Sequence, residues 1–502
     1  MSLAIIYSRS SNGIKTPQIS IEVHLGNGLP YLSIVGLPET VVKESKDRVR
    51  AALINSGFEF PSGRITINLA PADIPKDGGR LDLPIAIGIL AASSQIPDTH
   101  LDEYEFIGEL SLGGNLRSVK GVLPTAFACQ KAKRALIIPV ANANEASLIE
   151  DLRIYPAKNL LQLSQHLNQI QPIADYRHQA TVQPVHFEKD LSDVKGQLFA
   201  RRALEVAAAG RHNLLMIGPP GTGKTMLATR IATILPPMTK EEALESASIS
   251  SISHQGFNIK QWGLRPMRDP HHTASGVALV GGGSKIRPGE ISLAHHGILF
   301  LDELTEFDRY ALDVLREPLE TGHITISRAA QQATFPAHFQ LVAAMNPCPQ
   351  GRDCDLRNNC RCGEKKRQRY LSRLSAPFLD RIDLQIEVPR LPREDLQNAP
   401  LGENSQSVQM RVIKAHTYQQ QRQGKNNHQL NNREIDQHCI LEPQDQKILA
   451  HAMDRFKLSA RAYHRILKVA RTIADLSQTE KINTLHLTEA LSYRAMDRFY
   501  QH

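Results

Sequence analysis

The sequence Gly218-Pro219-Pro220-Gly221-Thr222-Gly223-Lys224-Thr225 decides the fold of this chain. It fits the pattern Gly-x4-Gly-Lys-Thr, follows an apolar run at residues 213–217 and precedes a helix-like segment at residues 226–234. Strand, glycine-rich loop and helix in this order predict a cradle for the phosphates of a nucleoside triphosphate. Lys224 would reach the β and γ oxygens, and the Thr225 hydroxyl would ligate Mg²⁺. The alternative is a chance glycine-rich turn, which the matching flanks disfavour.

Asp302 and Glu303 are predicted to complete this site, because they follow the unbroken apolar run at residues 297–301, which is typical of a buried parallel strand. Asp302 would hold Mg²⁺, and Glu303 would polarise the water that attacks the γ-phosphate. Another strand, at residues 340–345, ends at Asn346, whose amide would orient that water; alternatively, Asn346 only begins a turn before Pro347. We therefore predict an enzyme that hydrolyses a nucleoside triphosphate. Its expected nucleotide-binding residues are Gly218, Pro219, Pro220, Gly221, Thr222, Gly223, Lys224, Thr225 and Asp302.

Length and composition agree with a multidomain globular enzyme. The 502 residues suffice for about three domains. Hydrophobic residues make up 41% and charged residues 22%, as is usual for soluble proteins. Residues 1–9 lack the pattern of a signal peptide, and Pro84 interrupts the apolar segment at residues 81–92. We expect a cytoplasmic protein with no membrane partner.

The pattern along the chain predicts an α/β architecture in four parts. Residues 1–172 alternate strand-like and helix-like segments and should form an α/β or α+β domain, and residues 173–190 should be a linker. Residues 191–389 carry the nucleotide site, and residues 390–502 have helical periodicity. The predicted strands are residues 19–23, 64–69 and 136–139; the predicted helices are residues 42–56, 83–93, 124–132, 408–422, 443–456, 460–476 and 487–498.

Charge and cysteine content suggest two further ligands. The net charge is +8, and residues 352–373 hold eight basic against three acidic residues, which favours a nucleic acid over a merely solvated face. Within that region and just before it stand Cys348, Cys354, Cys360 and Cys362. Four thiolates so close together in a cytoplasmic protein predict Zn²⁺, the alternative being free thiols in a loop. Cys129 and Cys439 should be small buried side chains.

Several longer motifs carry a resemblance to a known family. They are Arg268-Asp269-Pro270-His271-His272-Thr273, Gly281-Gly282-Gly283, Arg287-Pro288-Gly289-Glu290-Ile291-Ser292-Leu293-Ala294-His295 and Leu315-Arg316-Glu317-Pro318-Leu319-Glu320. The central domain resembles an AAA+ P-loop ATPase of the magnesium-chelatase-like group, and the order of parts resembles the ComM/YifB family. The resemblance implies a hexameric ring with ATP and Mg²⁺ at subunit interfaces. It also implies a helicase-like motor on single-stranded or branched DNA that promotes branch migration in natural transformation and recombination, with recombination proteins as partners.

The same resemblance assigns two arginines. The segment 378–383 is similar to the arginine-finger motif, so Arg381 would reach a neighbour's γ-phosphate; the alternative is an internal pair with Asp380 or Asp383. The start of the helix at 460–476 resembles the second sensor, which would let Arg461 read the γ-phosphate. The alternative is an exposed basic stripe of Arg461, Arg465 and Lys468 on one helical face.

The front domain resembles the proteolytic domain of Lon, which has the α+β fold of ribosomal S5 domain 2. The resemblance lies in Pro75-Lys76-Asp77-Gly78-Gly79 and in residues 107–114. Arg80 stands at the position of the nucleophilic serine and Thr125 at that of the lysine, so the Ser-Lys dyad is lacking and protease activity is not expected. The domain should have a structural or DNA-binding role.

Two segments of the central domain should face the pore or a neighbouring subunit. His271 and His272, together with Gly281 to Gly283, are interpreted as a loop insertion; adjacent residues on an extended chain point apart, which disfavours a shared metal ion. Residues 323–334 resemble a β-hairpin inserted before the first sensor, with Arg328 and Lys285 as candidate phosphate contacts. A rival function is a magnesium-chelatase-type metal-insertion or remodelling ATPase that acts on a partner protein.

Overall fold

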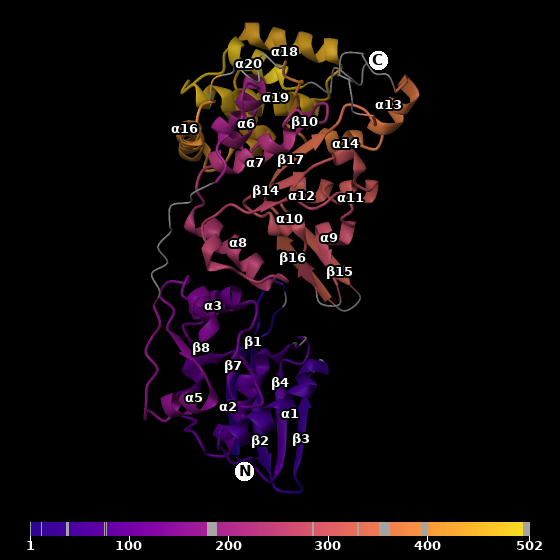
Figure 1. The fold of residues 1–502 in the computed structure, drawn as a ribbon. Helices are drawn as coiled ribbons and strands as arrows, with labels where there is room; N and C mark the ends of the chain where they lie inside the picture. Colours follow the sequence, from indigo (N-terminus) through magenta and orange to yellow (C-terminus); the bar gives the residue numbers. More distant parts are fainter. Residues whose placement is uncertain are drawn as a thin grey trace.

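The computed structural model has three parts, which follow one another along the molecule in Figure 1. The structure describes residues 2–11, 13–36, 40–74, 76, 78–177, 188–283, 286–328, 331–350, 362–392, 400 and 402–494. No helix within these ranges is both long enough and apolar enough to cross a bilayer. The N-terminal part lies at one end, the phosphate-loop part in the middle and the C-terminal helices at the other end.

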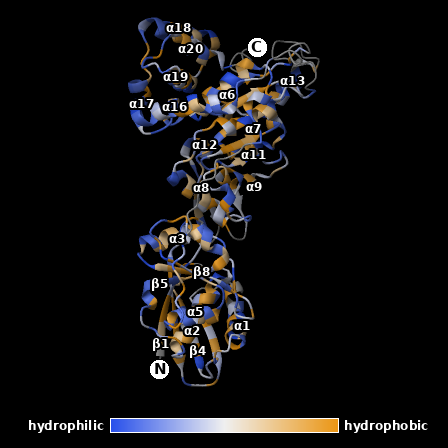
Figure 2. Ribbon diagram, turned by 60° about the vertical axis from the view of Figure 1, so that its left-hand side comes forward, coloured by the Kyte–Doolittle hydropathy of each residue, from blue (hydrophilic) through white to orange (hydrophobic). Residues whose placement is uncertain are grey.

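The N-terminal part is built on a four-stranded sheet in the order β1-β2-β4-β3. Alternate residues of β2 and β4 are buried, because one face of the sheet packs on α2, a helix buried along its whole length. Figure 2 shows the hydrophobic colour gathering around α2. A parallel sheet, β5-β8-β9, and a short hairpin complete this part. The elements are β1 (Ser2–Arg9), β2 (Gln18–Gly26), β3 (Tyr31–Val35), α1 (Thr40–Asn55), β4 (Arg64–Ala70), α2 (Asp82–Ala92), β5 (Tyr104–Phe106), β6 (Glu109–Leu110), β7 (Leu116–Arg117), α3 (Val122–Lys131), β8 (Ala135–Pro139), α4 (Ala143–Ala146), β9 (Ile154–Ala157) and α5 (Leu160–Leu167).

The central part has a five-stranded parallel sheet in the order β11-β14-β17-β10-β18. The strands β10, β14 and β17 are buried on both faces, which is why their sequences are continuous apolar runs. The elements are α6 (Leu198–Gly210), β10 (Leu214–Ile217), α7 (Lys224–Ile234), α8 (Lys240–Ile252), β11 (Met267–Arg268), α9 (Gly276–Val280), β12 (Gly281–Gly282), β13 (Arg287–Pro288), α10 (Glu290–Leu293), β14 (Ile298–Leu301), α11 (Arg309–Asp313), α12 (Arg316–Thr321), β15 (His323–Arg328), β16 (Gln331–Pro336), β17 (Gln340–Met345), α13 (Glu364–Leu371), α14 (Ala376–Leu379) and β18 (Leu384–Glu387).

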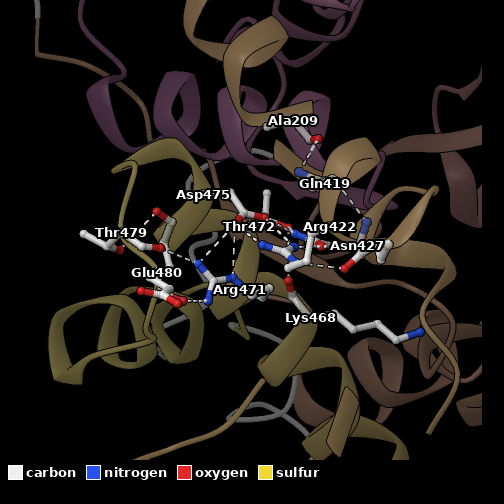
Figure 3. Close-up of polar contacts among 12 residues, drawn as sticks. Ala209, Gln419, Arg422, Asn427, Lys468, Arg471, Thr472, Asp475, Thr479 and Glu480 are labelled. Carbon is white, nitrogen blue, oxygen red and sulfur yellow. Dashed lines mark hydrogen bonds and ion pairs between the residues drawn. The ribbon is translucent and has the colours of Figure 1, made fainter. Parts of the chain in front are cut away.

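The C-terminal part is helical and packs on α6 of the central part. Its helices are α16 (Ser405–Gln423), α17 (Asn432–His438), α18 (Pro443–Phe456), α19 (Ala460–Leu476) and α20 (Thr484–Ser492). Four of the five helices start at an Asn or Ser side chain that accepts a backbone N–H of the first turn. A buried polar network joins α16, α19 and the end of α6, where Gln419 Nε2 donates to the Ala209 carbonyl over 3.0 Å (Figure 3).

The N-terminal part contacts the central part at two places. The Gly121 N–H at the start of α3 donates to the Ser251 carbonyl of α8 over 3.0 Å, and Ala247 of α8 is buried in the same apolar cluster as Leu123. Elsewhere, Gly13 lies so close to β16 that an added Cβ would stand 3.3 Å from Ala333. The first domain therefore contacts both α8 and the β15–β16 hairpin.

The predicted mixture of an α/β core with C-terminal helices is confirmed. The helices predicted at residues 443–456 and 460–476 have those bounds, and the hairpin at residues 323–334 is antiparallel as expected. The last predicted helix ends earlier, at Ser492, and residues 495–498 lie outside the described part. The sequence interpretation named no helix at α6 or α8, each of 13 residues, or at α17, of seven.

Candidate nucleotide site

The candidate site lies where three neighbouring strands end. The phosphate loop follows β10, Asp302 follows β14 and Asn346 follows β17. These strands are adjacent and parallel, so their carboxyl ends meet at one edge of the sheet. Ligands of open α/β sheets bind at this edge.

The loop has the backbone that a phosphate cradle needs. Gly221 and Gly223 have φ angles of 79° and 87°, in the left-handed region that favours glycine. An added Cβ at Gly218 would stand 2.2 Å from the Val388 carbonyl oxygen, so this position also requires glycine. The loop leads directly into the N-terminus of α7 at Lys224, where free N–H groups attract anions. The loop therefore fits a triphosphate.

Lys224 is buried at the centre of the site. Its Nζ donates to the carbonyls of Gly218 over 2.7 Å and Pro219 over 2.9 Å, and lies 3.3 Å from Asn346 Oδ1. Burial lowers the pKa of Lys224, while the nearby charges of Asp302 and Glu303 oppose that shift. Bound phosphate oxygens would offer this ammonium group better partners than the loop carbonyls do.

Thr225 and Asp302 are in direct contact. The Thr225 hydroxyl donates to Asp302 Oδ2 over 2.6 Å, and the other carboxylate oxygen accepts the Glu303 N–H over 2.8 Å. A hydroxyl and a carboxylate side by side next to a phosphate loop match the hard oxygen ligands of Mg²⁺, which keeps several waters in such sites. The residues present therefore fit MgATP.

Glu303 stands beside a histidine that the sequence interpretation did not assign to this site. Its carboxylate is half exposed, and Oε2 lies 3.1 Å from His272 Nδ1. Glu303 also has a φ of 51°, an uncommon conformation for a residue other than glycine. The loop after β11 brings Asp269 close as well, and burial together with the charge of Asp302 raises the pKa of Asp269. Nothing in the sequence indicated that the loop holding Asp269 and His272 lies next to the end of β14.

One expectation about the histidine pair is wrong. We expected adjacent side chains to point apart, but the rings of His271 and His272 lie with centroids 4.1 Å apart and planes at 33°. The residues stand in a turn and not in a strand, so the alternation of an extended chain does not apply.

Arg381 lies at the opposite edge of the sheet. It precedes β18, whose first residue pairs with Leu214 and whose last pairs with Ile217. The strand rises about 3.3 Å per residue, so roughly 10 Å of strand separates the Arg381 end from the phosphate-loop end. The guanidinium forms an ion pair with Glu320, and not with Asp380 or Asp383 as the alternative had it.

Arg461 belongs to the same end of the molecule as Arg381. One turn further along α19, Arg465 donates to the Arg381 carbonyl over 3.2 Å and pairs with Asp383 over 2.5 Å. The Lys468 ammonium donates to the His428 carbonyl over 2.9 Å. Arg465 and Lys468 therefore point into the structure, and the three residues do not form an exposed stripe.

The structure brings together Lys224, Thr225, Asp302, Glu303 and Asn346, but not the remaining candidates. Cys348 and Cys362 are buried with sulfurs 3.4 Å apart, whereas Cys354 and Cys360 lie outside the described residues. Lys285 and the Arg328 side chain lie outside them too.

The N-terminal domain holds Arg80 and Thr125 together in its interior. Arg80 Nη2 donates to Thr125 Oγ1 over 2.8 Å, and that hydroxyl donates onward to the Gly121 carbonyl over 2.9 Å. Because neither partner is a base, nothing in this pair could activate the hydroxyl as a nucleophile. Pro75 and Asp77, from the motif beside this pair, lie outside the described residues.

Comparison with known proteins gives one consistent result. Family models described as magnesium chelatase subunit ChlI match residues 190–396 and 21–142, and the model of its C-terminal domain matches residues 402–494. The chain is 54% identical over 506 residues to competence protein ComM of Haemophilus influenzae, covering 100% of this chain and 99% of that protein. It is 51% identical over 503 residues, with the same coverage, to the uncharacterized protein YifB of Escherichia coli. Magnesium-chelatase subunit ChlI of Olisthodiscus luteus is 27% identical over 142 residues, which are 27% of this chain and 42% of that protein.

Proposed function

This chain belongs to the ComM/YifB family of magnesium-chelatase-like AAA+ ATPases, and from that premise we propose that it is a Mg²⁺-dependent, hexameric DNA motor. It would act in the cytoplasm as a helicase-like enzyme that uses ATP hydrolysis to extend branch migration during natural transformation and recombination. Its substrates would be single-stranded or branched DNA, with recombination proteins as partners.

The observation that carries the proposal is the direct contact of the phosphate-loop residues with Asp302 and Asn346. In the proposed reaction the oxygen of a water bonds to the γ-phosphorus and the bond to the β–γ bridging oxygen breaks. ADP keeps the electron pair, and Glu303 accepts the proton of the water. Asn346 would orient that water, and Lys224 would balance the charge on the phosphates. Mg²⁺, held by Thr225 and Asp302, would supply further positive charge at the phosphates.

The position of Arg381 supports the proposed ring. This arginine lies at the end of the sheet away from its own phosphate loop, which favours action on a nucleotide held by another copy of the chain. Arg461 lies on the same side of the molecule as Arg381, because Arg465, one turn further along α19, contacts the Arg381 carbonyl. We propose that both arginines act on the neighbour's γ-phosphate, which makes the neighbour necessary for turnover.

DNA as the partner is supported by the charge of the chain and by its sequence similarity to a competence protein. The net charge is +8, and α13 carries the basic run at residues 365–369, where Lys365, Lys366 and Arg369 are exposed. The relative with 54% identity is named a competence protein. The hairpin β15–β16 would contact the DNA strand in the pore.

ATP turnover measured with and without DNA tests this proposal. We expect single-stranded and branched DNA to raise the turnover of the wild type at low and at moderate salt, and we expect the wild type to extend strand exchange. Lys224→Ala should do neither. Glu303→Gln should bind ATP but lose turnover by on the order of 10² to 10⁴, because water activation is lost while the phosphate cradle remains. Turnover that does not respond to DNA would remove the DNA assignment, and normal turnover in Glu303→Gln would move the base elsewhere.

A remodelling ATPase of the magnesium-chelatase type is the second candidate, because ChlI models match three stretches of the chain. Such an ATPase would act on a partner protein. It is disfavoured by sequence identity, since the ChlI subunit of Olisthodiscus luteus is 27% identical over 27% of this chain, whereas competence protein ComM of Haemophilus influenzae is 54% identical over all of it. Turnover that rises with a co-purifying protein but not with DNA would favour it.

Zinc at Cys348, Cys354, Cys360 and Cys362 is a further element of the proposal. The burial and proximity of Cys348 and Cys362 support it, since thiolates gather around a tetrahedral ion. Elemental analysis should find about one zinc per chain in the wild type, and less in Cys362→Ser. A zinc-free wild type would remove the metal from the proposal.

A further inference from the structure

We propose that Glu320 is a positioning residue that holds Arg381 inside its own subunit and releases it when the β15–β16 hairpin moves. The inference rests on the proposed function, in which Arg381 serves the nucleotide of a neighbour. It adds a regulatory contact: a carboxylate that competes with the phosphate for the same guanidinium.

The contacts of Arg381 show how it is held. Nη2 forms an ion pair with Glu320 Oε1, and Nη1 donates to the Pro377 carbonyl over 2.5 Å. Nε is buried and has no hydrogen-bond partner among the described residues. The Arg381 side chain is 8% exposed, so in this arrangement it cannot reach another chain.

The backbone at Arg381 is anchored independently of its side chain. The Arg381 carbonyl accepts hydrogen bonds from Asn213 Nδ2 over 3.0 Å and from Arg465 Nη1 over 3.2 Å. Asp383, two residues on, accepts the Asn213 N–H over 2.9 Å and pairs with Arg465. The side chain can therefore change rotamer and swing outward while its backbone stays in place.

Glu320 is the member of the pair that can be displaced. It is 50% exposed, and water weakens an ion pair at such a position. It also lines a cleft of about 420 Å³ together with Arg211, Arg465 and Lys468, and it is the sole acidic side chain among the lining residues in the described part of the chain. An incoming phosphate would therefore meet an excess of positive charge in this region. The Arg381 guanidinium would bind a multiply charged phosphate more strongly than the single charge of the Glu320 carboxylate.

Glu320 is also directly connected to the hairpin. It lies in the last turn of α12, and β15 begins three residues later at His323. The joining residue, Gly322, has a φ of 72°, and its carbonyl accepts the Ala337 N–H from the end of β16 over 2.7 Å. An added Cβ at Gly322 would stand 1.9 Å from the His338 ring, so the junction is tightly packed. A displacement of the hairpin by DNA would therefore be transmitted to Glu320.

The substitution Glu320→Gln tests the inference, because it removes the charge and keeps the size. The control is Glu317→Gln, an exposed glutamate on the same helix. The first measurement is the rate at which phenylglyoxal modifies Arg381 in nucleotide-free protein, followed by mass spectrometry of the peptide. We expect the modification rate to rise about fivefold in Glu320→Gln, because the loss of one exposed ion pair shifts the equilibrium between the held and the released side chain by about that factor. In the control the rate should stay unchanged.

The second measurement is ATP turnover with and without DNA. In Glu320→Gln we expect DNA-free turnover to rise by a similar factor and the stimulation by DNA to shrink accordingly. Equal modification rates in the variant and the control would overturn the inference, as would lower DNA-free turnover in a variant that melts at the wild-type temperature. Modification needs neither ATP nor DNA. A wild type that does not respond to DNA would therefore contradict the proposed function and leave the test of Glu320 intact.

Discussion

Thr225 donates its hydroxyl hydrogen to Asp302 over 2.6 Å, although 77 positions separate the two residues in the sequence. The contact exists because β10 and β14 flank β17 in the same parallel sheet and end at the same edge. It brings a hydroxyl and a carboxylate to one point beside the phosphate loop, an arrangement that fits Mg²⁺.

Thr225→Val should raise the Mg²⁺ concentration needed for half-maximal ATP turnover by roughly 10- to 100-fold, because one ligand and its hydrogen bond to Asp302 are lost. A titration of turnover against Mg²⁺ at fixed ATP measures this. The matched control is Thr229→Val on the same helix, since that hydroxyl donates only to the Met226 carbonyl. Equal Mg²⁺ requirements in the two variants would show that Thr225 does not hold the metal.

His272→Ala should lower kcat by roughly 10- to 100-fold and leave the KM for ATP nearly unchanged, because the polar partner of the imidazole is the Glu303 carboxylate and not a residue of the phosphate loop. Steady-state kinetics over a range of ATP concentrations separates the two parameters. Recovery of kcat in His272→Asn, which can still donate a hydrogen bond, would support orientation of Glu303 as the cause. An increase in KM alone would contradict it.

The local patterns of the sequence were sufficient for the elements that carry the site. The phosphate loop, the strands around it and the helices at residues 443–456 and 460–476 each have their signal within a short window. Even α17, which was not predicted, has such a signal, because Asn431 and Glu434 form a capping box at its start.

The pairings between distant elements could not be predicted in the same way. His272 contacts Glu303 because the loop after β11 turns toward the end of β14, and Arg381 pairs with Glu320 because α12 passes beside the start of β18. Both contacts depend on the paths of loops and on side-chain rotamers. Neither produces a periodic pattern in the sequence, so neither contact could be predicted from it. Charge alone pointed to Asp380 and Asp383 as partners of Arg381, whereas Asp383 is already occupied by Arg465.

Mixing two inactive variants should restore ATP turnover if Arg381 acts on a neighbouring subunit. Arg381→Ala alone should lose turnover by about 10³-fold or more, and Lys224→Ala should be inactive. In an equimolar mixture, about a quarter of the interfaces of a closed ring would combine an intact phosphate loop with an intact arginine. Turnover of the mixture, with ring assembly checked by size, measures this. A mixture as inactive as its components, although assembled, would contradict action between subunits.

Asp475→Asn should destabilise the C-terminal part by about 3–5 kcal/mol, because it leaves the buried Arg471 and the partly buried Arg422 without their shared counter-ion. Asp475 is 3% exposed and receives hydrogen bonds from Arg422 over 2.6 and 3.0 Å, from Arg471 over 3.1 Å and from Asn427 over 2.8 Å (Figure 3). Thermal unfolding of the two proteins measures the loss. Asp454→Asn, at an exposed position of α18, should change stability by less than about 0.5 kcal/mol.

A cluster of histidines at the start of β14 should make the fold sensitive to acid. His295 is buried; its Nδ1 accepts the His338 N–H over 3.0 Å, so its Nε2 carries the proton that faces Glu245 Oε2 at 3.1 Å. Burial lowers the pKa of His295 to about 4, and the hydrogen bond from His295 lowers the pKa of Glu245 to about 2. The neighbouring charged or titratable groups are His296, His338, Arg211 and Glu242.

The same hydrogen bonds disfavour a metal ion at His295. An ion on Nε2 would require the proton to move to Nδ1, where it would face the His338 N–H.

The stability lost on acidification follows from these directions. Below pH 6.5 the unfolded chain protonates His295 while the folded chain does not, so the free energy of unfolding falls between pH 6.5 and 4, by on the order of 3 kcal/mol for this residue. Glu245 adds a further loss between pH 4.5 and 2, because its folded pKa is the lower one. We therefore expect His295→Gln to show a smaller drop in melting temperature from pH 7 to 4 than the wild type, and His451→Gln, at an exposed position, to follow the wild type. A parallel drop in all three proteins would show that His295 is not the group responsible.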